Sequence, residues 1–284
     1  MTTIQDFSGY TPTWCPGCGD WGIGAAVKTA FVQMGYSPSS LFVVFGIGCS
    51  GNMNDFLNAY ALHALHGRSI PNAVGMKFAR HKTPVVVIAG DGDCYGEGGN
   101  HFLHACRGNH DITVVVHDNG VYGLTTGQVA PTAQKGFKSK STPAGIIEIP
   151  VNPLSLAVSQ GATFVAQGFA GNIPQLIDLI KKGIQHRGFS LINILQPCVT
   201  FNKINTYAYY REKVYEMPKD YDPSSFAQAF AKSLEPTYIE KFPVGVLYQV
   251  QRPVFTDLLP QLSGSTLLER SRYDDFGSLL EDFV

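Results

Sequence analysis

Three short apolar runs rich in valine constrain the fold of this chain more than any other feature: residues 41–45, 84–89 and 112–116. Uninterrupted runs of this kind are typical of strands buried on both faces, as in a parallel sheet. The rhythm continues along the chain, with helix-like stretches at residues 24–34, 55–66, 98–107 and 173–184 and a strand-like run at 189–194. Strands that alternate with helices predict an α/β fold, with one parallel sheet covered by helices on both faces.

The composition favours a packed core, since 44% of the 284 residues are hydrophobic and only 15% are charged. Lys and Arg number 21 against 22 for Asp and Glu. This balance leaves no broad basic surface, so we expect no nucleic-acid partner. The apolar runs are too short to cross a bilayer and the first residues lack a secretory pattern, so we expect no membrane association and a cytoplasmic location. In that compartment the six cysteines are more often metal ligands or free thiols than disulfides.

Two segments break the alternation. Residues 125–150 contain Gly, Thr, Ser, Lys and Pro without an apolar period, and loops of this length inside compact domains are usually functional. After Cys198 the chain is rich in tyrosine, with a short helix predicted at 225–234 and a strand at 244–250. We therefore predict an α/β domain over residues 1–205 and a C-terminal extension over 206–284 that acts as a subunit-docking arm.

Polar residues follow two of the predicted strands. Gly90, Asp91, Gly92 and Asp93 come directly after the run 84–89, and Asn119 follows the run 112–116. Ligands of open parallel sheets bind beyond the carboxyl ends of the strands, where both groups fall. Asp91 and Asn119 offer the oxygen ligands that Mg²⁺ prefers, and the two glycines let backbone amides approach an anion. The alternative is two tight turns, which Gly, Asp and Asn also favour.

The cysteines suggest a second site. Four of them have the spacing or setting of metal ligands: Cys15, Cys18, Cys49 and Cys198. Four thiolates are enough for a [4Fe–4S] cluster or a tetrahedral zinc, and the spacing does not choose between them; Cys49 and Cys198 could also be buried small hydrophobes. Cys49 follows a predicted strand at the same sheet edge as Asp91, which favours an electron-transfer cluster. Cys94 and Cys106 are assigned to packing.

The pair of Gly-Asp-Gly and a following Asn resembles the cofactor motif of thiamine diphosphate-dependent enzymes. By this resemblance the Asp91 carboxylate, the Asn119 side chain and the Val121 carbonyl hold Mg²⁺ against the diphosphate. The family commonly has a second Asn just before the ligand, and Asp118 stands there in this chain.

Taken together the motifs resemble the β subunit of a 2-oxoacid:ferredoxin oxidoreductase of the two-subunit type. The resemblance runs from Trp14 to about Tyr210 and rests on these motifs: Trp-Cys-Pro-Gly-Cys-Gly-Asp, Gly-Ile-Gly-Cys-Ser, Leu-His-Gly-Arg, Gly-Asp-Gly-Asp, Gly-Gly-Asn-His and Tyr-Gly-Leu-Thr-Thr-Gly-Gln. It implies that Cys15, Cys18, Cys49 and Cys198 carry one [4Fe–4S] cluster. It also implies coenzyme A as co-substrate, ferredoxin as electron acceptor, and an α subunit in an (αβ)2 assembly.

Size also argues for a partner. Thiamine chemistry needs a carboxylate at the pyrimidine ring, usually from a second domain. Only about 80 residues remain beyond the α/β region, without a second strand–helix alternation, so this chain provides half of an active site.

The resemblance predicts these cofactor contacts: Ile47, Gly48, Cys49, Ser50, His66, Gly90, Asp91, Gly92, Asp93, Asn119, Val121, Gly123, Leu124 and Thr125. No catalytic residue is assigned with certainty. His66, Asn52 and Thr126 are predicted neighbours of the substrate or cofactor. Many two-subunit relatives have Lys where this chain has Asn52 and Thr126, so Arg68, Lys77 or a partner group is left to meet the distal carboxylate of 2-oxoglutarate, the favoured substrate ahead of pyruvate.

Two other functions fit parts of the pattern. One is a non-oxidative thiamine-dependent decarboxylase subunit whose cysteines hold zinc. The other is an iron–sulfur electron carrier without catalysis of its own.

Overall fold

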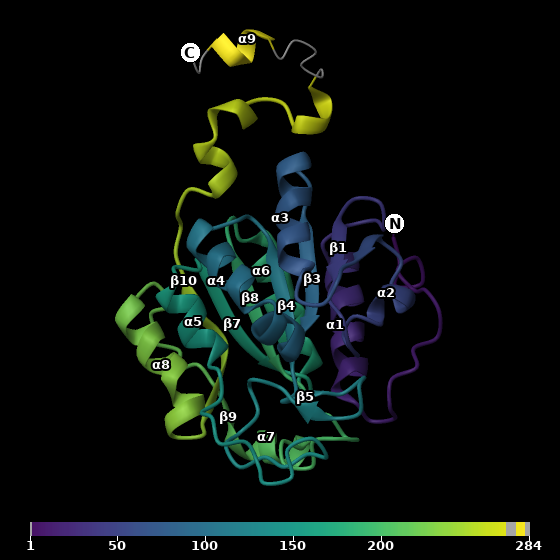
Figure 1. Cartoon of the computed structure of the whole chain (residues 1–284), viewed down its shortest axis with the longest axis vertical. Coiled ribbons are helices and arrows are strands. Elements are labelled where there is room, and N and C mark those ends of the chain that lie inside the picture. Colours follow the sequence, from purple (N-terminus) through teal and green to yellow (C-terminus); the bar gives the residue numbers. More distant parts are fainter. Residues whose placement is uncertain (1, 271–276, 282–284) are drawn as a thin grey trace.

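The computed structural model describes residues 2–270 and 277–281. In this part of the chain one eight-stranded sheet has the order β2-β1-β3-β4-β8-β7-β10-β9 (Figure 1). The strands are β1 Phe42–Phe45, β2 Tyr60–His63, β3 Val85–Gly90, β4 Thr113–Asp118, β7 Phe164–Phe169, β8 Ser190–Leu195, β9 Val214–Glu216 and β10 Phe242–Gln249. All neighbours pair in parallel except β7 and β10. A separate hairpin joins β5 Val121–Tyr122 to β6 Gln128–Val129.

Helices cover both faces of the sheet, as predicted. The helices are α1 Gly19–Gln33, α2 Met53–Phe56, α3 Ser69–Ala79, α4 Gly99–Gly108, α5 Pro153–Ser159, α6 Ile173–Gln185, α7 Tyr207–Lys213, α8 Phe226–Tyr238 and α9 Gly277–Leu280. The α1 and α6 helices pack with Val43 and Val86 in one apolar core. The α3, α4, α5 and α8 helices pack with Val44 and Val87 in the other. Alternate residues of each strand enter opposite cores, which explains why the strand runs are apolar throughout.

The prediction of a helix over residues 55–66 is wrong. This region forms the one-turn helix α2 and then β2, an edge strand that pairs in parallel with β1. The α3 and α5 helices and the β7 strand are additional elements that the sequence did not predict. The segment 125–150 is irregular except for β6, as expected.

The first part of the C-terminal extension completes the sheet. Its β10 strand pairs with β7 and carries β9 at the edge, and α8 packs against the core. Three short 3₁₀ helices follow: η2 Phe255–Leu258, η3 Pro260–Leu262 and η4 Leu267–Glu269. In Figure 1 this last segment leaves the body at the end away from β5 and α7. The division after residue 205 and the docking role of the extension stay predictions.

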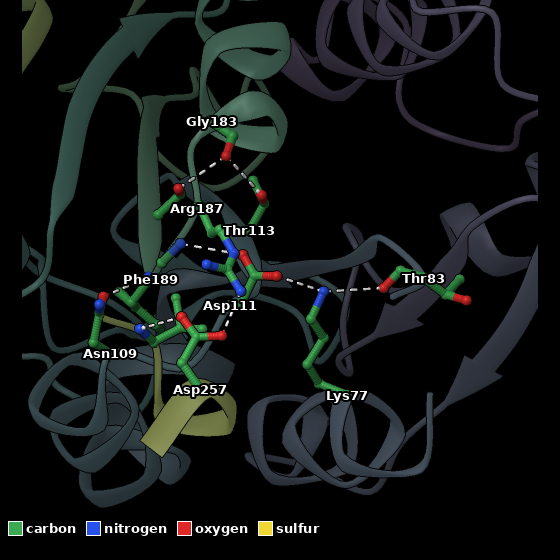
Figure 2. A network of polar contacts seen from close by, with 12 residues as sticks. Lys77, Thr83, Asn109, Asp111, Thr113, Gly183, Arg187, Phe189 and Asp257 are labelled. Atoms are coloured by element: carbon green, nitrogen blue, oxygen red, sulfur yellow. Dashed lines mark hydrogen bonds and ion pairs between the residues drawn. The ribbon is translucent and has the colours of Figure 1, made fainter. Parts of the chain in front are cut away.

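Charged side chains neutralise one another at the end of the sheet where β3, β4 and β8 begin (Figure 2). The Lys77 ammonium lies 2.6 Å from the Asp111 carboxylate and donates to the Thr83 carbonyl at 3.1 Å. Arg187 pairs there with Asp257 of η2. We call this region the amino end of the sheet. No helix among the described residues has both the length and the apolar character needed to cross a membrane.

Candidate active site

The opposite, carboxyl end of the sheet brings the predicted site residues together. Because β1, β3, β4 and β8 are parallel neighbours, the turns that follow them meet at one rim. A crevice of about 490 Å³ opens there, and it is lined by Ile47, Gly48, Cys49, Ser50, His66, Gly90, Asp91, Gly92, Asp93, Asn119, Val121, Tyr122, Gly123, Leu124 and Thr125. All the predicted cofactor contacts are in this lining, and the structure adds Tyr122.

Asp91 is one of two buried acids in the crevice, with Asp93. It caps η1, a π-helix over Gly92–Glu97, and its carboxylate accepts hydrogen bonds from the amides of Gly92 at 2.9 Å and Gly120 at 2.8 Å. The Thr132 hydroxyl donates to the same carboxylate. Burial, and then the nearby Asp118 charge, raise the pKa of Asp91 to about 7. A buried carboxylate with this much unbalanced negative charge suits a bound cation.

Asn119 is held so that its oxygen and its nitrogen have separate roles. Its Oδ1 accepts a hydrogen bond from the Val121 amide at 2.9 Å, and its Nδ2 donates to Gln196 Oε1 at 2.6 Å. Gly120, between Asn119 and Val121, has a φ of 73°, which lets the chain turn into β5. Asp91, Asn119 and the Val121 carbonyl each offer an oxygen atom, the type of ligand that Mg²⁺ prefers together with phosphate and water.

The walls of the crevice fit an anion such as a diphosphate. Ser50 is 3% exposed and its hydroxyl has no partner. A Cβ on Gly90 would lie 3.4 Å from this hydroxyl, so glycine keeps the space beside it open. His66 Nδ1 lies 3.0 Å from Asp93 Oδ1, which also accepts from the Ile47 and Gly67 amides. This pairing leaves the Nε2 of the ring available to a ligand.

The four candidate cysteines belong to the same rim. The Trp14 indole donates to the Cys49 carbonyl at 2.7 Å, and the Gly19 amide donates to the Pro197 carbonyl at 3.1 Å, which joins the N-terminal turn to the turns after β1 and β8. A Cβ on Gly123 would lie 3.4 Å from the Cys49 sulfur and 3.9 Å from the Cys198 sulfur.

The thiolate forms of two of these cysteines would need a positively charged partner. Burial, and then Asp20 and neighbouring cysteines, raise the pKa of Cys49 to about 12, and burial also raises the pKa of Cys18. Across the described ranges no three His, Cys, Asp or Glu side chains converge on a single-ion site. Cys94 and Cys106 are buried in the apolar core.

The candidate substrate neighbours lie just outside the crevice lining. Asn52 precedes α2, and Thr126 follows Thr125 with an unusual φ of 76°. The exposed Arg68 donates to the Gly67 and Glu97 carbonyls beside His66. The suggestion that Lys77 could meet the substrate is wrong, because its ammonium is buried against Asp111 at the amino end of the sheet.

Comparisons with known proteins identify the family. Residues 46–194 match the family "Thiamine pyrophosphate enzyme, C-terminal TPP binding domain", and residues 198–264 match the C-terminal region of the family "Pyruvate ferredoxin oxidoreductase beta subunit". The chain is 43% identical over 249 residues to the 2-oxoacid:ferredoxin oxidoreductase subunit beta of Saccharolobus solfataricus, with 83% of this chain and 81% of that protein covered. It belongs to the β subunits of the 2-oxoacid:ferredoxin oxidoreductases.

Other members of this family agree. The 2-oxoglutarate synthase subunit KorB of Archaeoglobus fulgidus is 42% identical over 192 residues, covering 67% of this chain and 71% of that one. A solved structure, 2-oxoglutarate:ferredoxin oxidoreductase from Magnetococcus marinus with 2-oxoglutarate, coenzyme A and succinyl-CoA bound, superposes with a TM-score of 0.87 at 40% identity, covering 89% of this chain and 87% of that one. The chain is therefore a subunit of a thiamine-dependent oxidoreductase, and a β subunit implies an α partner.

Three residues near the site were not predicted from the sequence. Thr132 and Gly120 donate to Asp91, and Gln196 bonds Asn119. Thr132 lies within the irregular segment 125–150, whose expected functional role was the available signal. Gln196 directly precedes Pro197 and Cys198, a position that hinted at a role near the cysteines.

Proposed function

We propose that this β subunit and an α subunit together catalyse the coenzyme A-dependent oxidative decarboxylation of a 2-oxoacid and pass the electrons through a [4Fe–4S] cluster to ferredoxin. One observation carries the proposal: Cys49 and Asp91 line the same crevice. The proposed cluster ligand Cys49 and the proposed metal ligand Asp91 then lie beside the same cofactor. The two-subunit assembly is proposed to be (αβ)2.

Asp91, Asn119 and the Val121 carbonyl are proposed to hold Mg²⁺, with Ser50 and His66 facing the diphosphate. When bound, thiamine diphosphate supplies a nucleophilic carbon for the oxo group and an electron sink for decarboxylation. The chain's contribution is to bury the Asp91 charge, to orient the Asn119 oxygen, and to keep the Gly90 and Gly92 backbone close to the anion. These contributions set the position of the cofactor and are independent of the substrate.

Cys15, Cys18, Cys49 and Cys198 are proposed to ligate the cluster. Burial raises the pKa of the Cys18 and Cys49 thiols, so these two need a metal centre to become thiolates. Cys49 lines the same crevice as Asp91. That position suits an electron-transfer cluster better than a purely structural zinc.

The preferred substrate is proposed to be 2-oxoglutarate, with pyruvate next. The solved relative from Magnetococcus marinus binds 2-oxoglutarate and coenzyme A. Arg68, beside His66 at the crevice, is the cation of this chain that we propose for the distal carboxylate. The remainder of the substrate pocket is assigned to the α subunit, because the crevice supplies the diphosphate end alone.

The test is anaerobic purification of the complex co-expressed with its α subunit, followed by metal, sulfide and thiamine diphosphate analysis. We expect a brown protein with four irons per β subunit, and ferredoxin reduction that is faster with 2-oxoglutarate than with pyruvate. Colourless protein with stoichiometric zinc would contradict the proposal, and so would a coloured protein without thiamine diphosphate. Cys198→Ser should lose cluster iron, while Cys106→Ser, a change in the apolar core, should keep it.

A further inference from the structure

Gln196 joins the two halves of the proposed site. It follows β8, it is 1% exposed, and both ends of its side-chain amide are engaged. Its Oε1 accepts a hydrogen bond from Asn119 Nδ2 at 2.6 Å, and its Nε2 donates to the Cys18 sulfur at 3.1 Å. One buried amide thus spans from a proposed magnesium ligand to a proposed cluster ligand.

The direction of these bonds follows from the backbone. The Val121 amide can only donate, so the atom of Asn119 that faces it at 2.9 Å is the oxygen. The Asn119 nitrogen therefore faces Gln196, which must present its own oxygen there. The Gln196 nitrogen is then the end that faces Cys18, with a further contact to the Pro197 carbonyl at 3.3 Å.

The surroundings are shaped to hold this side chain. A Cβ on Gly19, the residue after Cys18, would lie 2.7 Å from Gln196 Cγ and 3.3 Å from Pro197 Cδ. Glycine at this position is what leaves room for the glutamine to pass. The same sulfur also contacts the Asp20 carboxylate at 3.3 Å. Once Cys18 is a thiolate this carboxylate repels it, and Gln196 is the neutral donor on the sulfur.

Resting on the proposed function, we propose that Gln196 is a positioning residue that couples the thiamine diphosphate site to the cluster. Its oxygen keeps the Asn119 oxygen turned toward the metal. Its nitrogen stabilises negative charge on the Cys18 sulfur, and therefore raises the reduction potential of the cluster, because hydrogen bonds to sulfur favour the more negative reduced state. A single side chain then influences both the affinity for thiamine diphosphate and the reduction potential of the cluster.

The experiment compares Gln196→Met with Gln167→Met in the complex with the α subunit. Methionine has a similar length and shape but neither amide atom. Gln167 is the matched control, since it is also buried, its nitrogen donates to the Pro243 carbonyl and its oxygen accepts from Asn193, so it bonds neither Asn119 nor Cys18. The readouts are the cluster midpoint potential, from an EPR-monitored redox titration without thiamine diphosphate, and Mg²⁺-dependent thiamine diphosphate affinity by calorimetry.

We expect Gln196→Met to shift the midpoint potential to a more negative value and to weaken thiamine diphosphate binding roughly 10- to 100-fold, the usual effect of losing an outer-shell partner. Gln167→Met should change neither. Unchanged potential and affinity in Gln196→Met would overturn the inference, and so would a change in only one of them. A wild-type complex without a cluster or without bound thiamine diphosphate would instead overturn the proposed function.

Gly19→Ala is the second variant, to be measured if Gln196→Met loses its cluster iron. It keeps the amide but displaces it, since the new methyl group needs the space of Gln196 Cγ. The expected result is a shift of both properties in the same direction as for Gln196→Met. A wild-type potential and affinity in Gly19→Ala would count against the coupling.

Discussion

The two ends of the sheet differ in how particular carboxylates are balanced. At the amino end the Asp111 carboxylate lies 2.6 Å from the Lys77 ammonium, and Arg187 pairs with Asp257. At the carboxyl end burial, and then the nearby Asp118 charge, raise the pKa of Asp91, and the ion pairs of the described residues include neither carboxylate. Asp111 and Asp257 at the amino end are therefore neutralised by the chain itself, whereas Asp91 at the carboxyl end is left for an external cation.

Replacing Asp91 at the carboxyl end should have the largest effect on cofactor binding. Asp91→Ala should abolish Mg²⁺-dependent thiamine diphosphate binding, because it removes the charged ligand of the metal, and it should leave the cluster colour unchanged. Asp111→Ala at the amino end should bind the cofactor like wild type. Calorimetry and iron analysis of both complexes check this, and full cofactor occupancy in Asp91→Ala would show that the metal lies elsewhere.

Removing the Lys77 cation at the amino end should lower the stability of the fold and leave cofactor binding unchanged. Lys77 is 5% exposed, and loss of one partner from a buried ion pair leaves the other charge uncompensated, at a typical cost of about 3–5 kcal/mol. We therefore expect Lys77→Met to lower the free energy of unfolding by about 3 kcal/mol, measured by urea denaturation of the cofactor-free chain. The double variant Lys77→Met/Asp111→Leu should recover part of this loss, and cofactor affinity should be unchanged in both.

The sequence predicted the carboxyl end well because its residues follow strands directly. Once the runs at 84–89 and 112–116 are recognised as parallel strands, the residues after them must meet at one rim. Contacts made by distant residues had no such local signal. Thr132 reaches Asp91 across 41 positions and Gln196 reaches Asn119 across 77. Lys77 was placed near the substrate because of its charge alone. In the structure it pairs with Asp111, which lies just before β4.

The errors in the fold have a similar cause. Residues 55–66 contain apolar residues at helical spacing, but pairing with β1 turns part of them into an edge strand. The β7 strand was not predicted because Gln167 and Gly168 interrupt its apolar run. In the structure the Gln167 amide is satisfied by the Pro243 carbonyl of β10, and Gly168 makes room for the Leu176 side chain. Both exceptions depend on tertiary partners that no local pattern contains.

A buried histidine gives the amino end a dependence on pH. His186 is 6% exposed, its Nε2 lies 2.8 Å from the Thr163 hydroxyl, and burial lowers its pKa below the ordinary value of 6.5. The unfolded chain therefore binds this proton more readily, and stability is lost as the pH falls below about 6.5. We expect the free energy of unfolding to fall between pH 7 and pH 5. Urea denaturation at both pH values should show a smaller loss in His186→Gln, and an equal loss would assign the effect to another group.

The two ends also differ in backbone strain. Asn109, at the end of α4, has a φ of 47°, which asparagine tolerates, and its side chain bonds the Arg252 and Pro253 carbonyls. Thr126, beside the crevice, has a φ of 76°, which is strained for a β-branched residue, and its side chain is exposed.

Glycine relieves such strain but adds freedom to the unfolded chain, so Thr126→Gly should raise the free energy of unfolding by only about 0.5 kcal/mol. Asn109→Gly should lower it by about 2 kcal/mol, because its hydrogen bonds are lost. If Thr126 faces the 2-oxoacid as predicted, Thr126→Gly should also raise the KM for 2-oxoglutarate while the midpoint potential of the cluster stays constant. A stabilised variant with wild-type KM would mean that the strain at Thr126 serves the loop and not the substrate.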